Sequence, residues 1–97
     1  IGDFLILRAI RESDGFATSV EDDDILLAQR ECAVAEGILL CPEGAATLAA
    51  LKKEIVSGRI SRSERAMLFN CASGLKYPLP HAGSPLDIRQ PIDYHDL

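Results

Sequence analysis

A short apolar run followed at once by small polar residues, within residues 64–77, is the feature that most constrains how this chain folds. The run is A-M-L-F at 66–69, and the residues after it are Asn70, Cys71, Ser73 and Gly74. Apolar residues bounded by turn formers predict a short strand buried on both faces. Ligands of open α/β sheets bind beyond the carboxyl ends of such strands, where small residues let a ligand approach the backbone. We therefore expect a ligand-contacting edge at residues 70–74.

Charge and hydropathy exclude two classes of partner. The 97 residues carry a net charge of −5, and the 10 Lys and Arg residues are scattered without a basic stripe, which argues against nucleic acid. No apolar run approaches the roughly 18 residues that a membrane span needs, and no signal peptide is evident. Because the chain begins at Ile1 inside an apolar pattern, we expect it to be a piece of a longer protein.

The cysteines predict a reducing compartment. Cys32, Cys41 and Cys71 are odd in number and widely spaced, which favours free thiols in a cytoplasmic protein over a disulfide framework. A zinc site that combines them with His81 and His95 lacks the paired ligand spacing of known zinc motifs. We therefore predict no metal site.

The first part of the chain predicts a helix and a strand. Asp3 is a candidate N-cap for a helix over residues 4–11, and the helix is apolar nearly all round, so we expect it to be buried on several sides. Gly15 suits a left-handed position at its end. Residues 16–20 alternate large and small side chains and predict a short strand.

Four consecutive acids at 21–24 allow two interpretations, a divalent-metal site or the first turn of a helix. The residues that follow favour the helix, because apolar side chains recur at helical spacing up to Glu36 and Gly37 then stops the pattern. One helical turn also cannot point three neighbouring carboxylates at a single ion.

A third, alanine-rich helix is predicted over residues 43–57. Residues 38–41 form a brief extended stretch, Pro42 suits a helix start, and Gly58 closes the element. The alanines allow close approach to a neighbouring sheet or helix. Beyond Tyr77, four prolines exclude a long helix or an interior strand, so residues 79–97 are expected to be a tail.

The order of these elements predicts an α/β protein with a parallel sheet in which helices dominate. The candidate strands are too few and too short to stand alone, so we expect an incomplete three-layer domain over residues 1–78. Its partner strands would lie in sequence outside this chain.

Three colinear segments together resemble the threonine synthase family. They are G-D-F-L-I-L-R-A-I-R-E-S-D-G at 2–15, E-G-I-L-L-C-P-E-G-A-A-T-L-A-A-L at 36–51, and L-F-N-C-A-S-G-L-K-Y-P at 68–78. The resemblance covers the C-terminal part of such enzymes, which belong to the tryptophan-synthase-β-like, fold-type II class that uses pyridoxal phosphate. It implies conversion of O-phospho-L-homoserine and water to L-threonine and phosphate, with the cofactor as the electron sink.

The resemblance also implies roles for three residues. A hydroxyl residue of this family faces the pyridine nitrogen, and aligning G-L-K at 74–76 puts Cys71 at that position, where a thiol is a weaker hydrogen-bonding partner. Ser73, two residues further on, is the alternative. Glu43 lies on a segment that comes near the cofactor face in relatives, or it is only a first-turn acid that satisfies the helix dipole.

The family's Schiff-base lysine and phosphate-binding loop lie earlier in the chain than the part present here. The lysines Lys52, Lys53 and Lys76 do not match that position. We therefore expect the 97 residues to be inactive alone, to need the N-terminal part of the enzyme as a partner, and to self-associate through exposed apolar surface. The alternatives are another fold-type II enzyme, such as cysteate synthase or threonine dehydratase, and a self-standing interaction module.

Overall fold

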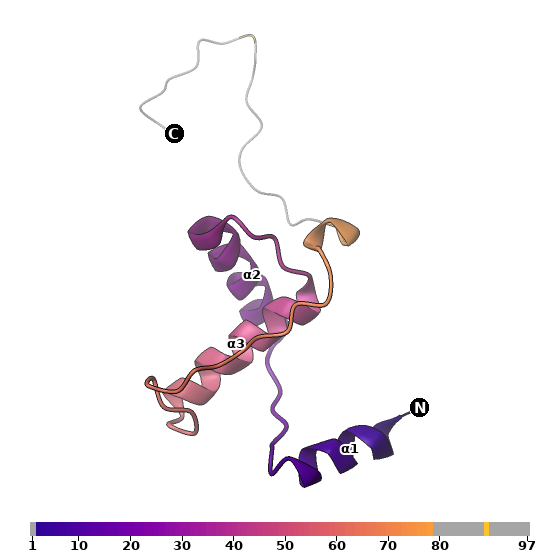
Figure 1. Ribbon diagram of the computed structural model, residues 1–97. Helices are drawn as coiled ribbons and strands as arrows, with labels where there is room; N and C mark the ends of the chain where they lie inside the picture. Colours follow the sequence, from indigo (N-terminus) through magenta and orange to yellow (C-terminus); the bar gives the residue numbers. More distant parts are fainter. Residues whose placement is uncertain (1, 79–88, 90–97) are drawn as a thin grey trace.

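The computed structural model describes residues 2–78 and 89, and helices dominate this part of the chain (Figure 1). The elements are α1 (Asp3–Glu12), α2 (Asp22–Glu36), α3 (Pro42–Val56) and the 3₁₀ turn η1 (Gly74–Lys76). Helices α2 and α3 pack against each other, whereas α1 lies apart from them at the end of an extended connection. After α3 the chain runs back along that helix to η1, near the α3 N-terminus (Figure 1). The tail expected at 79–97 lies outside the described residues, apart from Arg89.

Helix α2 begins and ends where the sequence predicted. Its first turn consists of Asp22, Asp23 and Asp24, whose carboxylates face the positive end of the helix dipole. Gly37 follows its last residue with φ 67°, a left-handed conformation that glycine adopts without strain. The acidic run is therefore the start of a helix, as expected.

Helix α3 runs from Pro42 to Val56, one residue earlier at each end than the predicted 43–57, and Pro42 lies at its start as expected. Cys41 is its N-cap, and the Cys41 sulfur accepts a hydrogen bond from the Gly44 N–H. Proline at the first helical position leaves no further N–H unsatisfied. Gly58, with φ 79°, then turns the chain away from the helix.

The core is small and lies between α2 and α3. Its buried residues are Ala28 on α2, Leu40 before α3, and Ala45 and Ala49 on α3. Three of these four are alanines, so the two helix backbones can approach closely. The sequence predicted close approach of the alanine-rich helix to a neighbouring sheet or helix, and the neighbour here is α2.

A junction of two extended segments closes one end of the helix pair. Leu40 and Ser73 form an isolated antiparallel bridge, and the Gly74 N–H donates to the Leu39 carbonyl at 3.0 Å. The Gln29 amide, buried on α2, donates to the Leu40 carbonyl at 2.6 Å. We call residues 37–41 and 70–75 the junction, because these bonds hold both segments beside the α3 N-terminus.

Residues 66–69, predicted to be a buried strand, are neither paired nor buried within residues 2–78, and the strand stays a prediction because its partners were expected outside this chain. Met67 is 97% exposed and Phe69 is 78% exposed, and no residue between 61 and 72 is in a strand. A strand requires hydrogen bonds to a neighbouring strand, and none of the described residues supplies one here. The apolar run is therefore extended and solvent-facing.

The predicted strand at residues 16–20 is wrong, because polar side chains of α3 bind this segment in place of a neighbouring strand. Thr18 Oγ1 donates to Glu54 Oε1 at 2.7 Å, and Lys53 Nζ donates to the Ser19 carbonyl at 2.6 Å. The Arg59 guanidinium lies 4.5 Å from the centre of the Phe16 ring. Residues 16–20 thus run beside the C-terminal half of α3 without regular structure.

Helix α1 differs from its prediction in burial and in its ends. None of its residues is buried, because no other described element packs against its apolar side chains. Gly2, with φ 97°, precedes the helix as its cap, so Asp3 is the first helical residue rather than the cap. At the other end, Asp14, with φ 53°, takes the left-handed position that was expected at Gly15.

The predicted parallel sheet has no counterpart within residues 2–78, where the one bridge, Leu40 to Ser73, is antiparallel. The other strands of the predicted sheet were expected outside this chain, so the parallel sheet stays a prediction. None of the helices in the described part of the chain has the length and apolarity needed to cross a bilayer.

Glu54 should make the fold pH-dependent. The Thr18 hydroxyl bond, followed by the nearby Arg59, holds the pKa of the Glu54 carboxyl below its ordinary value. A carboxylate of this kind stabilises the fold above its unfolded pKa of about 4.3, and this stability is lost as pH falls through the lower folded pKa. We expect Glu54→Gln to lower the melting temperature at neutral pH, with the difference from wild type disappearing in strong acid.

Thermal melts followed by circular dichroism at several pH values measure this effect. Glu12→Gln is the matched control, because Glu12 pairs with Arg8 on the exposed surface of α1, where an ion pair contributes little. A Glu54→Gln difference that stays constant down to strong acid would contradict the assignment.

Gly74 should be required for the junction. A Cβ at this position would lie 2.5 Å from the Leu40 carbonyl oxygen and 2.7 Å from Leu39 Cγ, so the two segments would have to separate. We expect Gly74→Ala to destabilise the fold by about 1–3 kcal/mol, the usual cost of overpacking. It should also remove the hydrogen-exchange protection of the residue 74 amide.

Gly15→Ala is the control, because a Cβ there would meet only the Ser13 hydroxyl at 3.0 Å and the Ile10 carbonyl at 3.6 Å. Equal effects of the two substitutions on the denaturant midpoint would mean that close packing at Gly74 does not hold the junction together.

Candidate functional site

All three residues that the resemblance singled out lie in the junction or next to it. Glu43 comes from the first turn of α3, while Cys71 and Ser73 come from the segment that pairs with residues 37–41. Metal-ligating atoms of Cys41, Glu43 and Cys71 all lie within 4.8 Å of one another. The site therefore forms where the start of a helix meets a returning segment.

Cys41 is the buried centre of this group. It is fully buried at the N-cap of α3, and its sulfur accepts the Gly44 N–H at 3.3 Å. Its own S–H donates to Asn70 Oδ1 at 3.4 Å, across the two segments of the junction. Gly44 permits this approach, because a Cβ on residue 44 would collide with the Asn70 side chain.

Cys71 lies next to Cys41 but is exposed. The two sulfurs are 3.7 Å apart, and since Cys41 donates to Asn70, Cys71 is the donor of the bond between them. That bond, together with partial desolvation, raises the pKa of the Cys71 thiol. Cys71 therefore presents a neutral thiol at the surface of the junction.

Glu43 carries the negative charge of the site. The Tyr77 hydroxyl donates to Glu43 Oε1 at 2.7 Å, and this bond is the main reason that the pKa of the Glu43 carboxyl is lowered. The same bond raises the pKa of Tyr77, because the phenol is held as the donor. A neutral thiol and an ionised carboxylate thus stand side by side.

Ser73 caps the short η1 turn. Its Oγ accepts the Leu75 N–H at 3.3 Å, which leaves the hydroxyl proton able to bind an acceptor. Beside Cys71 and Ser73 lies an open depression of about 510 Å³, which we call the junction depression. Its lining comes from both segments of the junction: Gly37, Ile38, Leu39, Asn70, Cys71, Ala72, Ser73 and Leu75.

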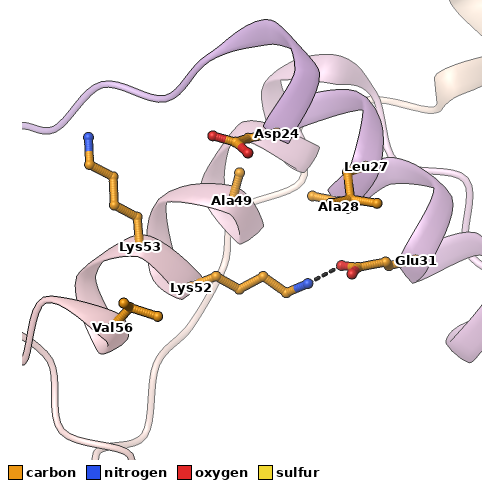
Figure 2. Close-up of a pocket in the computed structure, with 8 residues that line it drawn as sticks. All are labelled: Asp24, Leu27, Ala28, Glu31, Ala49, Lys52, Lys53 and Val56. Carbon is orange, nitrogen blue, oxygen red and sulfur yellow. Dashed lines mark hydrogen bonds and ion pairs between the residues drawn. The ribbon is translucent and has the colours of Figure 1, made fainter.

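A second cavity, of about 260 Å³, follows the packing groove between α2 and α3 (Figure 2). An ion pair between Lys52 of α3 and Glu31 of α2 spans it. Lys53, on the same helix, binds the Ser19 carbonyl. Both lysines are exposed, as the sequence predicted, and their contacts hold the helices and the connecting segment together.

Sequence reasoning missed two members of the site, Cys41 and Tyr77, and it placed Asn70 at the ligand-contacting edge without its contact to Cys41. Cys41 had a usable signal, since the residue before a helix-starting proline occupies the N-cap and its side chain can bind the first turn. Asn70 and Tyr77 are distant from residues 41–43 in sequence, so only the fold shows their contacts. His81 and His95, which had been weighed with the cysteines, lie outside the described residues.

Comparison with known proteins identifies the family. A family model described as pyridoxal-phosphate dependent enzyme matches residues 2–72. Curated threonine synthases from Methanocaldococcus jannaschii and Methanosarcina acetivorans are 42% and 44% identical over 72 residues, which is 74% of this chain and 18% of each relative. The threonine synthase of Halalkalibacterium halodurans is 35% identical over 72 residues, or 74% of this chain and 20% of the relative. No solved structure matches the chain.

These matches confirm the resemblance to threonine synthases, and they imply pyridoxal phosphate as the cofactor of the full-length enzyme. The chain spans only 18% of the length of the first two relatives. The chain belongs to the family of pyridoxal-phosphate dependent enzymes.

Proposed function

We propose that this chain is a C-terminal segment of a threonine synthase and that its junction is one wall of the cofactor site. The observation that carries the proposal is the identity of 42% and 44% to two threonine synthases over the same 72 residues. The whole enzyme would convert O-phospho-L-homoserine and water to L-threonine and phosphate. Pyridoxal phosphate supplies an electron sink for the proton removals of such a reaction.

The residues of the junction fit the pyridine edge of this cofactor. The Ser73 hydroxyl can donate to an unprotonated ring nitrogen, and the neutral, exposed Cys71 thiol can do so once its S–H turns from the Cys41 sulfur to the ring. A carboxylate at that position would instead hold the ring nitrogen protonated. The junction depression beside both side chains is open, as one wall of a site would be.

Glu43 would act on the same face as a fixed negative charge. Tyr77 holds one of its carboxylate oxygens, so the orientation of the carboxylate is set before any ligand arrives. We propose that it orients the substrate or cofactor by accepting a hydrogen bond there. Proton transfer and attachment of the cofactor would need groups from the rest of the enzyme.

The rest of the enzyme is the expected partner of this chain. Phe4 is 71% exposed, Ile6 62% and Met67 97%, which is far more apolar exposure than scattered surface residues would give. We propose that α1 and residues 66–69 pack against N-terminal parts of the enzyme, where 66–69 would join a parallel sheet within a three-layer domain. Isolated, the chain would self-associate through the same surfaces.

A lysine that attaches the cofactor would also come from the N-terminal part. Of the three lysines here, Lys52 pairs with Glu31 and Lys53 binds the Ser19 carbonyl, away from the junction depression. The third, Lys76 in η1, matches the G-L-K segment of the family and not the position of its Schiff-base lysine. The 97 residues alone would then be inactive. The free state of Cys32, Cys41 and Cys71 supports our proposal of a cytoplasmic location.

Substrate choice separates threonine synthase from other enzymes of its class. The longer enzyme that contains these residues should release phosphate from O-phospho-L-homoserine. A faster reaction with phosphoserine or with threonine would assign it to a cysteate synthase or a threonine dehydratase instead. Inactivity with all three substrates, together with no binding of pyridoxal phosphate, would support an interaction module.

Cys71 should contribute to cofactor affinity in that longer enzyme. Cys71→Ala removes one neutral hydrogen bond, so we expect the dissociation constant for pyridoxal phosphate to rise about 3- to 10-fold. Cys71→Ser, which keeps a donor, should bind about as tightly as wild type. Titration followed by the visible absorbance of the bound cofactor gives both constants.

Cys32→Ala is the matched control, because Cys32 lies on α2 and outside the junction. If Cys71→Ala binds the cofactor as tightly as this control does, Cys71 does not face the ring nitrogen, and the same measurement on Ser73→Ala then tests the alternative.

A further inference from the structure

Two thiols and a carboxylate meet at the α3 N-terminus, although the sequence spacing of the cysteines predicted no metal site. The ligating atoms of Cys41, Cys71 and Glu43 lie within 4.8 Å of one another. Two sulfurs and one oxygen form a donor set that suits Zn²⁺ and similar cations better than Mg²⁺ or Ca²⁺, which prefer oxygen ligands.

The separation of the sulfurs fits a single ion. Zn–S bonds of about 2.3 Å in a tetrahedral site place two sulfur ligands about 3.8 Å apart. The Cys41 and Cys71 sulfurs are 3.7 Å apart in the structure. An ion could therefore bind both sulfurs with little movement of the backbone.

Neighbouring groups already orient the ligands. The Gly44 N–H points at the Cys41 sulfur from 3.3 Å and fixes its position at the start of α3. The Tyr77 hydroxyl holds Glu43 Oε1, which leaves the second carboxylate oxygen for a metal. Hydrogen bonds of this kind to metal ligands normally fix their orientation.

We propose that Cys41, Cys71 and Glu43 bind one thiophilic divalent cation of the Zn²⁺ type. Each thiol releases its proton to solvent as its sulfur binds the ion, and the fourth tetrahedral position is left for water. The evidence for this site is the distances between its ligand atoms, and the proposal does not depend on the proposed enzyme activity. Because Cys71 would contact both this cation and pyridoxal phosphate, the two would compete for binding at the junction.

The test is a titration of the 97-residue chain with Co²⁺, in a reducing and metal-free buffer without pyridoxal phosphate. Tetrahedral Co²⁺ with thiolate ligands absorbs strongly in the visible range. We expect this absorbance to saturate at one ion per chain and to disappear when Zn²⁺ is added.

Variants assign the ligands. Cys41→Ser, Cys71→Ser and Glu43→Gln should each weaken Co²⁺ binding at least about 10-fold. Cys32→Ser and Glu12→Gln are the matched controls, which keep the site, and they should bind as wild type does. Serine at position 41 can still cap α3, and circular dichroism will show whether the helices remain.

Three results would overturn the site: no thiolate absorbance on addition of Co²⁺, a stoichiometry other than one ion per chain, or equal weakening by Cys32→Ser and Cys71→Ser. Cys71 is exposed, so Cys71→Ser should leave the fold intact. That variant decides the assignment even if Cys41→Ser loses its helices.

Discussion

The hydrogen bond from the buried Gln29 amide to the Leu40 carbonyl is the contact on which the junction depends. It links α2 to the residue before the α3 cap, and at 2.6 Å it satisfies a polar side chain that is only 5% exposed. Losing it would leave a buried amide without a partner, which costs more than the bond itself contributes. Because Leu40 also pairs with Ser73, this one bond fixes residues 37–41 and, through them, residues 70–75.

The chemistry of the junction follows from that placement. A sulfur at the N-cap of α3 receives a backbone N–H, and a second sulfur reaches it from the returning segment. The thiol that donates stays neutral, while the carboxylate that receives the Tyr77 hydroxyl stays ionised. Here the pKa of the thiol is raised and the pKa of the neighbouring carboxyl is lowered. Shifted pKa values of this kind are typical of ligand sites. The charge pattern thus arises from hydrogen bonding rather than from deep burial.

Local signals in the sequence predicted the helices well, whereas contacts between residues distant in the sequence could not be predicted from it. Pro42, Gly37 and the acidic run at 21–24 act within one turn of the chain, so the bounds of α2 and α3 were predictable. The strand predicted at 16–20 was wrong, because a strand depends on a partner that local residues do not specify. The resemblance selected Glu43, Cys71 and Ser73, and the apolar run pointed to Asn70, whereas Cys41 and Tyr77 join the site only through the fold.

A crystal structure of the longer enzyme with pyridoxal phosphate bound is the most direct test of the claim that the junction is a wall of the cofactor site. The account predicts the Leu40–Ser73 pairing as described here, with the ring nitrogen within hydrogen-bonding distance of Cys71 Sγ or Ser73 Oγ. A cofactor ring bound elsewhere, with residues 70–75 remote from it, would contradict the account.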